Sequence, residues 1–347
     1  MSSRRRAAGA LLAGIASLLV TTAMVSAPAA VAEDTRETAV VSLGDSAISG
    51  EGAGNYEPGT RGENGDWCHR SANALIHRTQ LAQRTFNLAC SGADAANVSL
   101  ADTSHYTEGS QARRLIDLAR AYRVTTVVVQ VGANDEPAFA DTVLDCVGAW
   151  INFFGPSCSS QLSGQWPGRL AAMAPRVDVA VNDVRTAMSQ AGYAAGSYNL
   201  VLASYASPFT ENMDPTWHGP QGCPIRIGDA RWGRTSAVPQ LSEALRGVAS
   251  RTGAKFLDLS RATEGREACS NRSSGTTGEW QNRVTVDPFA WWYGGLDAFG
   301  IHTAQESFHP NATGHAQFGR CLTEFINAGA TTARCLRGSD GNLHPTA

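Results

Sequence analysis

The chain has almost no lysine and no cluster of basic residues beyond its first few positions. Lys255 is its one lysine, arginine supplies the other basic side chains, and the formal net charge of the 347 residues is −3. A mildly acidic chain without a basic run argues against nucleic acid or an anionic membrane as the main partner. We therefore expect no nucleic-acid partner.

Long apolar runs are absent after the N-terminus. Three arginines at positions 4–6 precede an uncharged apolar stretch over residues 7–25, and small residues follow, ending in Ala-Val-Ala at positions 30–32. This pattern predicts a signal peptide over residues 1–32, which leaves a net charge of −6 when it is removed with its three arginines. The alternative is an uncleaved anchor, because the stretch nearly spans a bilayer. The small residues favour cleavage, so we expect an extracellular protein without stable membrane insertion.

The cysteines lack the close spacing of a metal site. No two of the eight are separated by only two residues, which argues against zinc, and we expect no metal. An even number behind a signal peptide indicates disulfides. The spacing does not fix their connectivity, but four consecutive short loops suggest the pairs Cys68–Cys90, Cys146–Cys158, Cys223–Cys269 and Cys321–Cys335.

No linker, repeat or charge block divides the mature chain. We therefore predict one domain over residues 33–335 and a polar C-terminal tail over 336–347. Apolar runs rich in β-branched residues are typical of parallel strands buried on both faces; they lie at 39–43, 85–89, 125–131, 199–203 and 255–259. Helical patterns alternate with them, at 71–83, 110–122, 170–190, 238–252 and 310–328. The alternation predicts a three-layer, doubly wound α/β fold with a mostly parallel sheet of about five strands.

Three polar side chains stand at the ends of these core elements. Ser46 follows the first strand, Asn134 follows the third, and His309 precedes the last helix. In open parallel sheets, ligands bind beyond the carboxyl ends of the strands. Acyl transfer needs a nucleophile, a base that takes its proton, and donors for the oxyanion. Serine, histidine and asparagine supply these parts, so the pattern favours a serine hydrolase.

Four short blocks, in order along the chain, resemble those of the SGNH/GDSL hydrolases. They are Gly44-Asp45-Ser46, the glycine block around Gly92, Gly132-Ala133-Asn134-Asp135 and His309-Pro310. The resemblance extends from residue 38 to 328, most of the mature chain. It implies the flavodoxin-like fold of that family and the activity of a secreted lipase or esterase of actinobacterial type. It also implies hydrolysis without a cofactor.

The resemblance makes Ser46 the nucleophile and His309 the general base. A serine at this position can also simply cap the next helix, but the other blocks favour catalysis. Because proline is common at the first helical position, we expect Pro310 to place His309 at the start of the last helix. Among the other C-terminal histidines, His302 is the alternative base, and His315 is expected to be a partly buried or surface residue. His344 falls in the predicted disordered tail.

The third member of the triad departs from the family pattern. An aspartate commonly stands three residues before the histidine, and this chain has Glu306 there. Its carboxylate can orient the imidazole as aspartate does; the alternative partner is the main-chain carbonyl of Glu306. The resemblance assigns the oxyanion hole to the backbone N–H groups of Ser46 and Gly92 and to the Asn134 amide. Gly92 and Asn134 are also good turn residues.

The preferred function is a secreted ester hydrolase acting on small-molecule or lipid esters as a monomer. A polysaccharide acetyl esterase is the alternative, a peptidase is chemically feasible, and a non-catalytic binding protein would have lost site residues. Long loops at 51–67, 206–234 and 261–299 are expected to wall the site. The last contains a possible aromatic wall for an acyl chain, or an aromatic loop anchor, made of Phe289, Trp291, Trp292, Tyr293 and Phe299.

Overall fold

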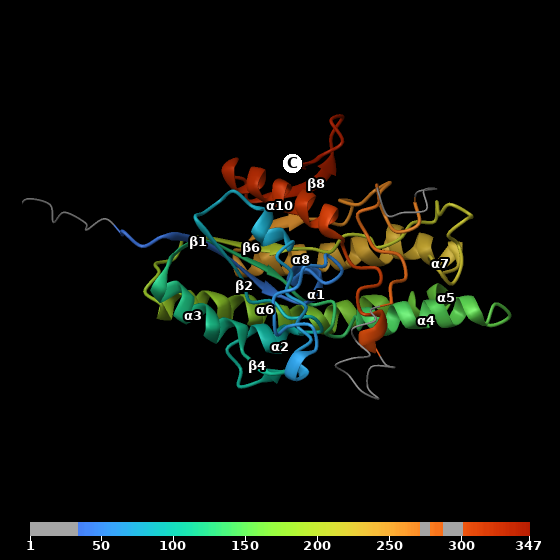
Figure 1. Cartoon of the computed structure of the whole chain (residues 1–347), viewed down its shortest axis with the longest axis horizontal. Coiled ribbons are helices and arrows are strands. Elements are labelled where there is room, and N and C mark those ends of the chain that lie inside the picture. The colour runs from blue at the N-terminus through green and yellow to red at the C-terminus, as the bar shows by residue number, and fades with distance from the viewer. Residues whose placement is uncertain (1–33, 271–277, 287–300) are drawn as a thin grey trace, which may run out of the picture. The chain divides into compact units, whose positions relative to one another are not determined.

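A central sheet of seven strands organises the described part of the chain, which comprises residues 34–270, 278–286 and 301–347 of this computed structural model (Figure 1). The predicted signal peptide lies outside these residues. The strand order is β2-β1-β5-β6-β7-β8-β9, and every pair is parallel except β8 with β9. The bounds are β1 Thr38–Gly44, β2 Arg84–Asn87, β5 Arg123–Gln130, β6 Asn199–Ala203, β7 Lys255–Asp258, β8 Thr332–Arg337 and β9 Leu343–Thr346. The first five positions are the predicted strands in flavodoxin-like order.

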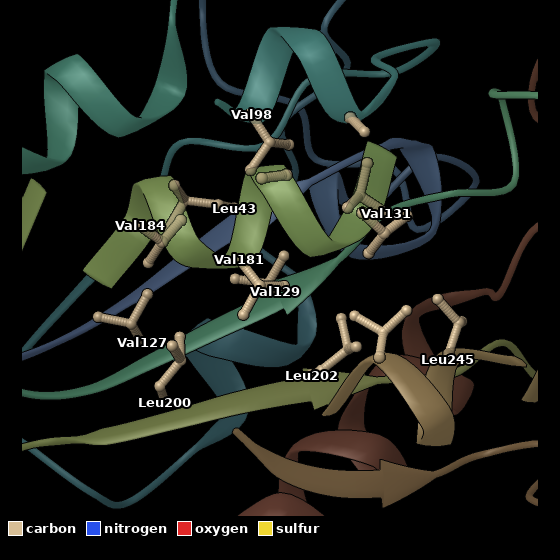
Figure 2. Close-up of a cluster of buried hydrophobic side chains, with 14 of the residues drawn as sticks. Leu43, Val98, Val127, Val129, Val131, Val181, Val184, Leu200, Leu202 and Leu245 are labelled. Atoms are coloured by element: carbon tan, nitrogen blue, oxygen red, sulfur yellow. The ribbon is translucent and has the colours of Figure 1, made fainter. Parts of the chain in front are cut away.

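Helices cover both faces of this sheet, as the absence of alternation in the strands predicts. One face packs against α2 (Ala95–Val98), α3 (Gln111–Ala121), α6 (Trp166–Gln190) and α8 (Val238–Thr252). The other packs against the 3₁₀ helix η2 (Leu75–Arg78) and α10 (Ala312–Asn327). Successive residues of β1 divide between the faces, since Val41 belongs to the first cluster and Val40 to the second. Figure 2 shows the first cluster, where Val181 and Val184 of α6 lie over Leu43 and Val129.

The remaining helices and strands lie in the connections that follow the carboxyl ends of the sheet strands. They are α1 (Ser46–Ser49), η1 (Glu63–Gly65), the hairpin of β3 (Ser104–His105) and β4 (Glu108–Gly109), α4 (Phe139–Ile151), α5 (Cys158–Leu162), α7 (Ile227–Trp232), the π-helical turn η3 (Gly233–Ala237) and η5 (Ile301–Ala304). None of the helices in the described ranges is long and apolar enough to cross a membrane.

The C-terminus differs from the prediction. Residues 336–347, expected to be a disordered tail, continue β8 and form β9, so they belong to the sheet. Leu343 is fully buried, and its N–H donates to Gln317 of α10 (2.9 Å). His344 contacts Glu324 across 2.8 Å. The polar composition concealed these strands, because β8 pairs with β7, which is remote in sequence, and β9 forms only by pairing with β8.

The predicted helix at 71–83 is also wrong, since only the short 3₁₀ helix η2 forms there. Its backbone donors are used by distant acceptors. The Ser71 N–H donates to the Ser49 carbonyl (2.9 Å), and the Leu75 N–H donates to His315 Nδ1 (3.2 Å). A regular helix would direct those donors to carbonyls four residues earlier. Tertiary contacts therefore override the local pattern.

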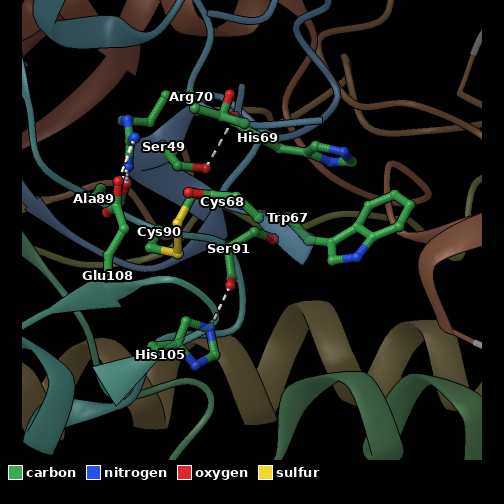
Figure 3. Close-up of a disulfide and its surroundings, with 12 residues drawn as sticks. Ser49, Trp67, Cys68, His69, Arg70, Ala89, Cys90, Ser91, His105 and Glu108 are labelled. Atoms are coloured by element: carbon green, nitrogen blue, oxygen red, sulfur yellow. Dashed lines mark hydrogen bonds and ion pairs between the residues drawn. A yellow bond between two sulfur atoms is a disulfide. The ribbon is translucent and has the colours of Figure 1, made fainter. Parts of the chain in front are cut away.

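Four disulfides join the cysteines in the consecutive pairs expected from the sequence, and all eight cysteines are used. Cys68–Cys90 ties the loop after β1 to the segment after β2, beside His69 and Ser91 (Figure 3). Cys223–Cys269 joins two of the long loops. The group Cys68, Cys90 and Glu108 has the compactness of a metal site, with its ligand atoms within 4.8 Å. Because those two sulfurs form a disulfide, they are not thiolate ligands.

Candidate active site

The turn after β1 presents Ser46 at the carboxyl edge of the sheet. Gly44 has φ +140°, and a Cβ there would lie 1.9 Å from the Gln130 carbonyl oxygen, so the close approach to β5 requires glycine. The Asp45 N–H donates to that same carbonyl (3.1 Å). The Asp45 carboxylate then accepts from the Ala47 N–H (3.0 Å) and caps α1. Ser46 is consequently the first residue of a helix, held by a rigid strand.

His309 lies directly against this serine. Its Nε2 is 2.8 Å from Ser46 Oγ, although 263 positions separate the residues. The backbone around His309 is fixed by Asn282, whose N–H donates to the His309 carbonyl (2.9 Å) and whose carbonyl accepts from Phe308 (3.2 Å). The expected helix start is wrong, because Asn311 caps α10 and His309 stands two residues earlier. An irregular turn, with Phe308 at φ +61°, therefore sets the imidazole.

The other imidazole nitrogen faces the main chain. His309 Nδ1 lies 3.1 Å from the Ser307 carbonyl oxygen. The Glu306 carboxylate, expected to orient the ring, instead accepts a hydrogen bond from the Tyr56 hydroxyl (2.8 Å). The carbonyl partner is thus one residue beyond the alternative considered from the sequence. The family spacing of three residues did not carry over because the longer glutamate side chain binds a loop that follows α1.

A buried polar network next to His309 was not predicted. The side chain of Glu51 is fully buried, 2.8 Å from His69 Nδ1, and its carboxylate accepts from Ser91 Oγ (2.7 Å) and Gln305 Nε2 (2.8 Å). Burial by itself raises the pKa of Glu51, but the charge and hydrogen bond of His69 outweigh it, and the pKa is lowered. The network adjoins the imidazole through Gly52, the residue after Glu51. Gly52 packs so closely against His309 that an added Cβ would lie 3.1 Å from the His309 Cβ.

These surroundings set the protonation of His309. Its pKa is lowered, chiefly because burial disfavours the charged ring, while the negative charge of Glu51 acts in the opposite direction. The ring is therefore neutral near pH 7, with a lone pair for the proton of a neighbouring hydroxyl. Glu51 would stabilise the cation that results. The residue escaped sequence analysis because it sits in a glycine-rich loop without a recognisable motif.

The two other predicted donors lie on neighbouring loops at the same edge. Asn134 shares a pocket with Ser46 and His309, and its Nδ2 donates to the Ala93 carbonyl (3.0 Å). Since an amide carries two hydrogens, one serves this bond and the second can serve a ligand oxygen. The Ala93 contact also ties Asn134 to the loop of Gly92, which has φ +80°. Asn134 thus occupies a position compatible with the predicted oxyanion hole, and Gly92 lies in the loop bound to it through Ala93.

An apolar pocket extends from Ser46 and His309. Most of its wall comes from large hydrophobic side chains of α4, α6, α7, α8 and the neighbouring loops, including Phe139, Val143, Trp166, Tyr205, Trp232, Leu241 and Phe308. The aromatic segment proposed from the sequence, Phe289 to Phe299, lies outside the described residues. Part of the pocket wall comes from segments identified in the sequence, namely the helix at 238–252 and the loop at 206–234, whereas α4 was not predicted.

His302 and His315, which also lie near the C-terminus, have environments that differ from that of His309. His302, the alternative base, stacks on Trp67 with ring centroids 4.2 Å apart and contacts Gln305 through Nδ1 (2.6 Å). His315 is fully buried, contrary to the prediction, and accepts from Leu75. Burial lowers the pKa of His315 to about 3, so it is a neutral structural residue. Of these histidines, His309 is the one in contact with Ser46.

A serine in contact with a half-buried, neutral imidazole at the carboxyl edge of a parallel sheet is the arrangement of a serine hydrolase. The GDSL-like lipase/acylhydrolase family matches residues 42–317. The chain belongs to this family and is a carboxylic ester hydrolase. The prediction from the four sequence blocks is thereby confirmed.

Two solved structures share the fold. An extracellular lipase from Streptomyces rimosus is 22% identical with a TM-score of 0.57, covering 84% of this chain and 99% of that one. A phospholipase A1 from Streptomyces albidoflavus is 23% identical with a TM-score of 0.54, covering 85% of this chain and 100% of that one. No curated protein matches the chain. At these identities the likeness describes the architecture of the sheet and its helices.

Proposed function

We propose that this hydrolase is a secreted lipase or esterase that works through a Ser46 acyl-enzyme, with His309 as general base. The observation that carries the proposal is the 2.8 Å contact between Ser46 Oγ and His309 Nε2 at the pocket. Nε2 takes the hydroxyl proton as Oγ attacks the ester carbon. The protonated ring then gives that proton to the leaving alcohol oxygen. Water repeats the sequence against the acyl-enzyme and releases the acid.

The main chain of Ser307 takes the place of a third catalytic side chain. With a proton on Nδ1, the ring donates to the Ser307 carbonyl (3.1 Å), and Nε2 keeps its lone pair toward Ser46. A carbonyl fixes this tautomer and orientation, two of the functions that an aspartate supplies in a triad. The buried charge of Glu51 supports the third, stabilisation of the imidazolium. The proposed machinery is a Ser46–His309 dyad.

The developing negative charge falls near the donors predicted from the sequence. We assign the oxyanion to the backbone N–H groups of Ser46 and Gly92 and to Asn134 Nδ2. Neutral, preorganised donors stabilise the tetrahedral intermediate without protonating it, and each is worth about 3 kcal/mol. The position of Asn134 in the wall of the pocket supports this assignment.

The apolar pocket favours substrates with a hydrocarbon acyl chain. Each methylene buried there contributes about 0.8 kcal/mol, so activity should rise with acyl length until the pocket is filled. An acetyl group would leave most of the apolar wall unused. A lipase or esterase is therefore preferred to the polysaccharide acetyl esterase.

Secretion is supported by the four disulfides, because such bonds persist in oxidising compartments. We propose that the leader is removed after Ala32. Mass spectrometry of protein from the culture medium should then find Glu33 at the N-terminus. If the leader is instead intact on cell-associated protein, residues 7–25 would act as an uncleaved membrane anchor.

The dyad is tested by replacing each partner. Ser46→Ala and His309→Ala should each abolish hydrolysis of nitrophenyl esters, and an alkyl phosphonate should label Ser46. Ser189→Ala, at an exposed serine of α6, is the matched control and should retain wild-type rates. Labelling of another serine, or a His309→Ala enzyme near the wild-type rate, contradicts the mechanism. An ester panel of increasing acyl length, run beside acetylated xylan, tests the substrate class.

A further inference from the structure

The hairpin of α4 and α5 exposes an unusual concentration of apolar side chains. Four of the eight large hydrophobic residues that are exposed in the described ranges lie here: Leu144 (57%), Ile151 (70%), Phe153 (67%) and Phe154 (89%). The ring centroids of Phe153 and Phe154 are 4.0 Å apart. We call residues 151–156 the α4–α5 tip; α4 and α5 lie at the right of Figure 1. Water-exposed aromatic residues in one place indicate a binding surface.

The α4–α5 tip is held in this exposed conformation by bonds on its inner side. The Cys146–Cys158 disulfide closes the hairpin. The Arg226 guanidinium donates to the carbonyls of Ala149 (2.8 Å), Asn152 (2.8 Å) and Gly155 (3.1 Å). A tip fixed by a covalent bond and by the half-buried Arg226 guanidinium cannot easily fold its phenyl rings inward. A partner therefore meets a preorganised apolar surface, which lowers the entropy cost of binding.

The opposite side of the same helix forms part of the active-site pocket. Phe139, Thr142, Val143 and Cys146 of α4 line the cavity that contains Ser46 and His309. One helix thus carries the exposed apolar residues toward solvent and an apolar wall toward the nucleophile. The N-terminal half of α4 thus lines the pocket that would hold an acyl chain, and the tip follows the C-terminal end of the same helix.

We propose that the α4–α5 tip inserts Phe153 and Phe154 into the hydrocarbon boundary of an uncharged or zwitterionic lipid aggregate. The proposal rests on the ester-hydrolase function above and names the physical form of its substrate. No acidic or basic residue occurs between positions 146 and 165, and the half-buried Arg226 that binds the tip has its guanidinium on three backbone carbonyls, so the inserted side chains carry no charge out of water. The charged residues on α4 are the exposed Asp141 and Asp145, which disfavour an anionic surface.

The experiment measures binding and catalysis separately. Sedimentation with phosphatidylcholine vesicles is done in the Ser46→Ala background, so that no lipid is hydrolysed. Adding Phe153→Ser and Phe154→Ser should weaken vesicle binding by at least about a hundredfold, because each buried phenyl side chain contributes about a factor of ten or more. In active enzyme the same double change should leave kcat/KM for a water-soluble nitrophenyl butyrate within about twofold of wild type. Binding should be unchanged between about 0.1 and 0.5 M NaCl, since the inserted phenyl side chains and the zwitterionic lipid carry no net charge.

Two further variants serve as controls. Phe153→Trp with Phe154→Trp should retain vesicle binding, because tryptophan is also favoured at the lipid interface. Val179→Ser removes an exposed apolar side chain from α6 and should change neither assay.

Several results overturn the proposal. They are unchanged vesicle binding by the serine variant, absence of vesicle binding by the parent protein, or a tip-dependent dimer in analytical ultracentrifugation. Loss of soluble-ester activity together with binding also overturns it, because the tip would then be part of the folded site. Failure of the ester-hydrolase function is distinguishable, since the enzyme with an intact tip would then fail to cleave the soluble ester.

Discussion

The charge of Glu306 provides a sharp test of how His309 is oriented. Replacing this residue by glutamine keeps its size and an acceptor oxygen for the Tyr56 hydroxyl, which now donates to the carboxylate at 2.8 Å. The contact between His309 Nδ1 and the Ser307 carbonyl involves only main chain on the acceptor side. The change therefore leaves the ring orientation intact. We expect kcat to stay within about threefold of wild type.

A triad predicts a very different value. Where an aspartate orients the histidine of a serine hydrolase, its conversion to the amide lowers kcat by about 10⁴. The two mechanisms are thus separated by about three orders of magnitude in kcat, or about 4 kcal/mol in activation free energy. The assay is kcat for nitrophenyl butyrate between pH 6 and 9. A dyad also predicts that the acid limb of the profile does not move.

Glu306→Leu serves as the structural comparison. It removes the acceptor of the Tyr56 hydroxyl, a largely buried group, and should lower the free energy of unfolding by about 1–3 kcal/mol. Activity per folded molecule should remain. A fall of a hundredfold or more in the glutamine variant, with an unchanged melting temperature, would refute the dyad and restore Glu306 as the third catalytic residue.

Three further predictions concern the neighbouring residues. Glu51→Gln should lower kcat by about tenfold. It should also move the acid limb of the rate profile to lower pH, because the negative charge of Glu51 raises the pKa of His309 and its removal lowers that pKa; a limb that stays in place would make Glu51 purely structural. Asn134→Ala should lower kcat by about 10²–10³ with little change in KM, and a large KM effect with normal kcat would instead indicate substrate binding. Burial raises the pKa of Asp45 from 3.8 to about 7, so the stability contributed by its proton is present at low pH and lost as pH rises through 7. In the Asp45→Asn variant this loss should be absent. Denaturant titration should therefore find that the free energy of unfolding of the variant minus that of wild type is about 2–3 kcal/mol larger at pH 8 than at pH 5. An equal difference at both pH values would contradict the raised pKa.

The sequence alone determined the class of the fold and the positions of five of the seven strands in the sheet. Buried parallel strands leave continuous β-branched runs, and the helices between them leave their own period, so the order and class of the fold are legible locally. Gly44 and Ser46 follow directly from the end of such a run. The cysteine pairs were also recognisable, because each closes a short loop between consecutive cysteines. The two C-terminal strands were missed, since a polar strand is specified by its neighbours in the sheet.

Only the tertiary structure decided how the imidazole is held. Glu306 and Ser307 are adjacent in sequence, and which of them faces His309 depends on the irregular turn through Phe308 and on the capture of Glu306 by Tyr56. The burial of Glu51 beside the same ring is likewise a property of the folded loops. Backbone carbonyls carry no sequence signature, and the electrostatic effect of a carboxylate depends on its distance and dielectric surroundings, so neither could be derived before the chain was folded.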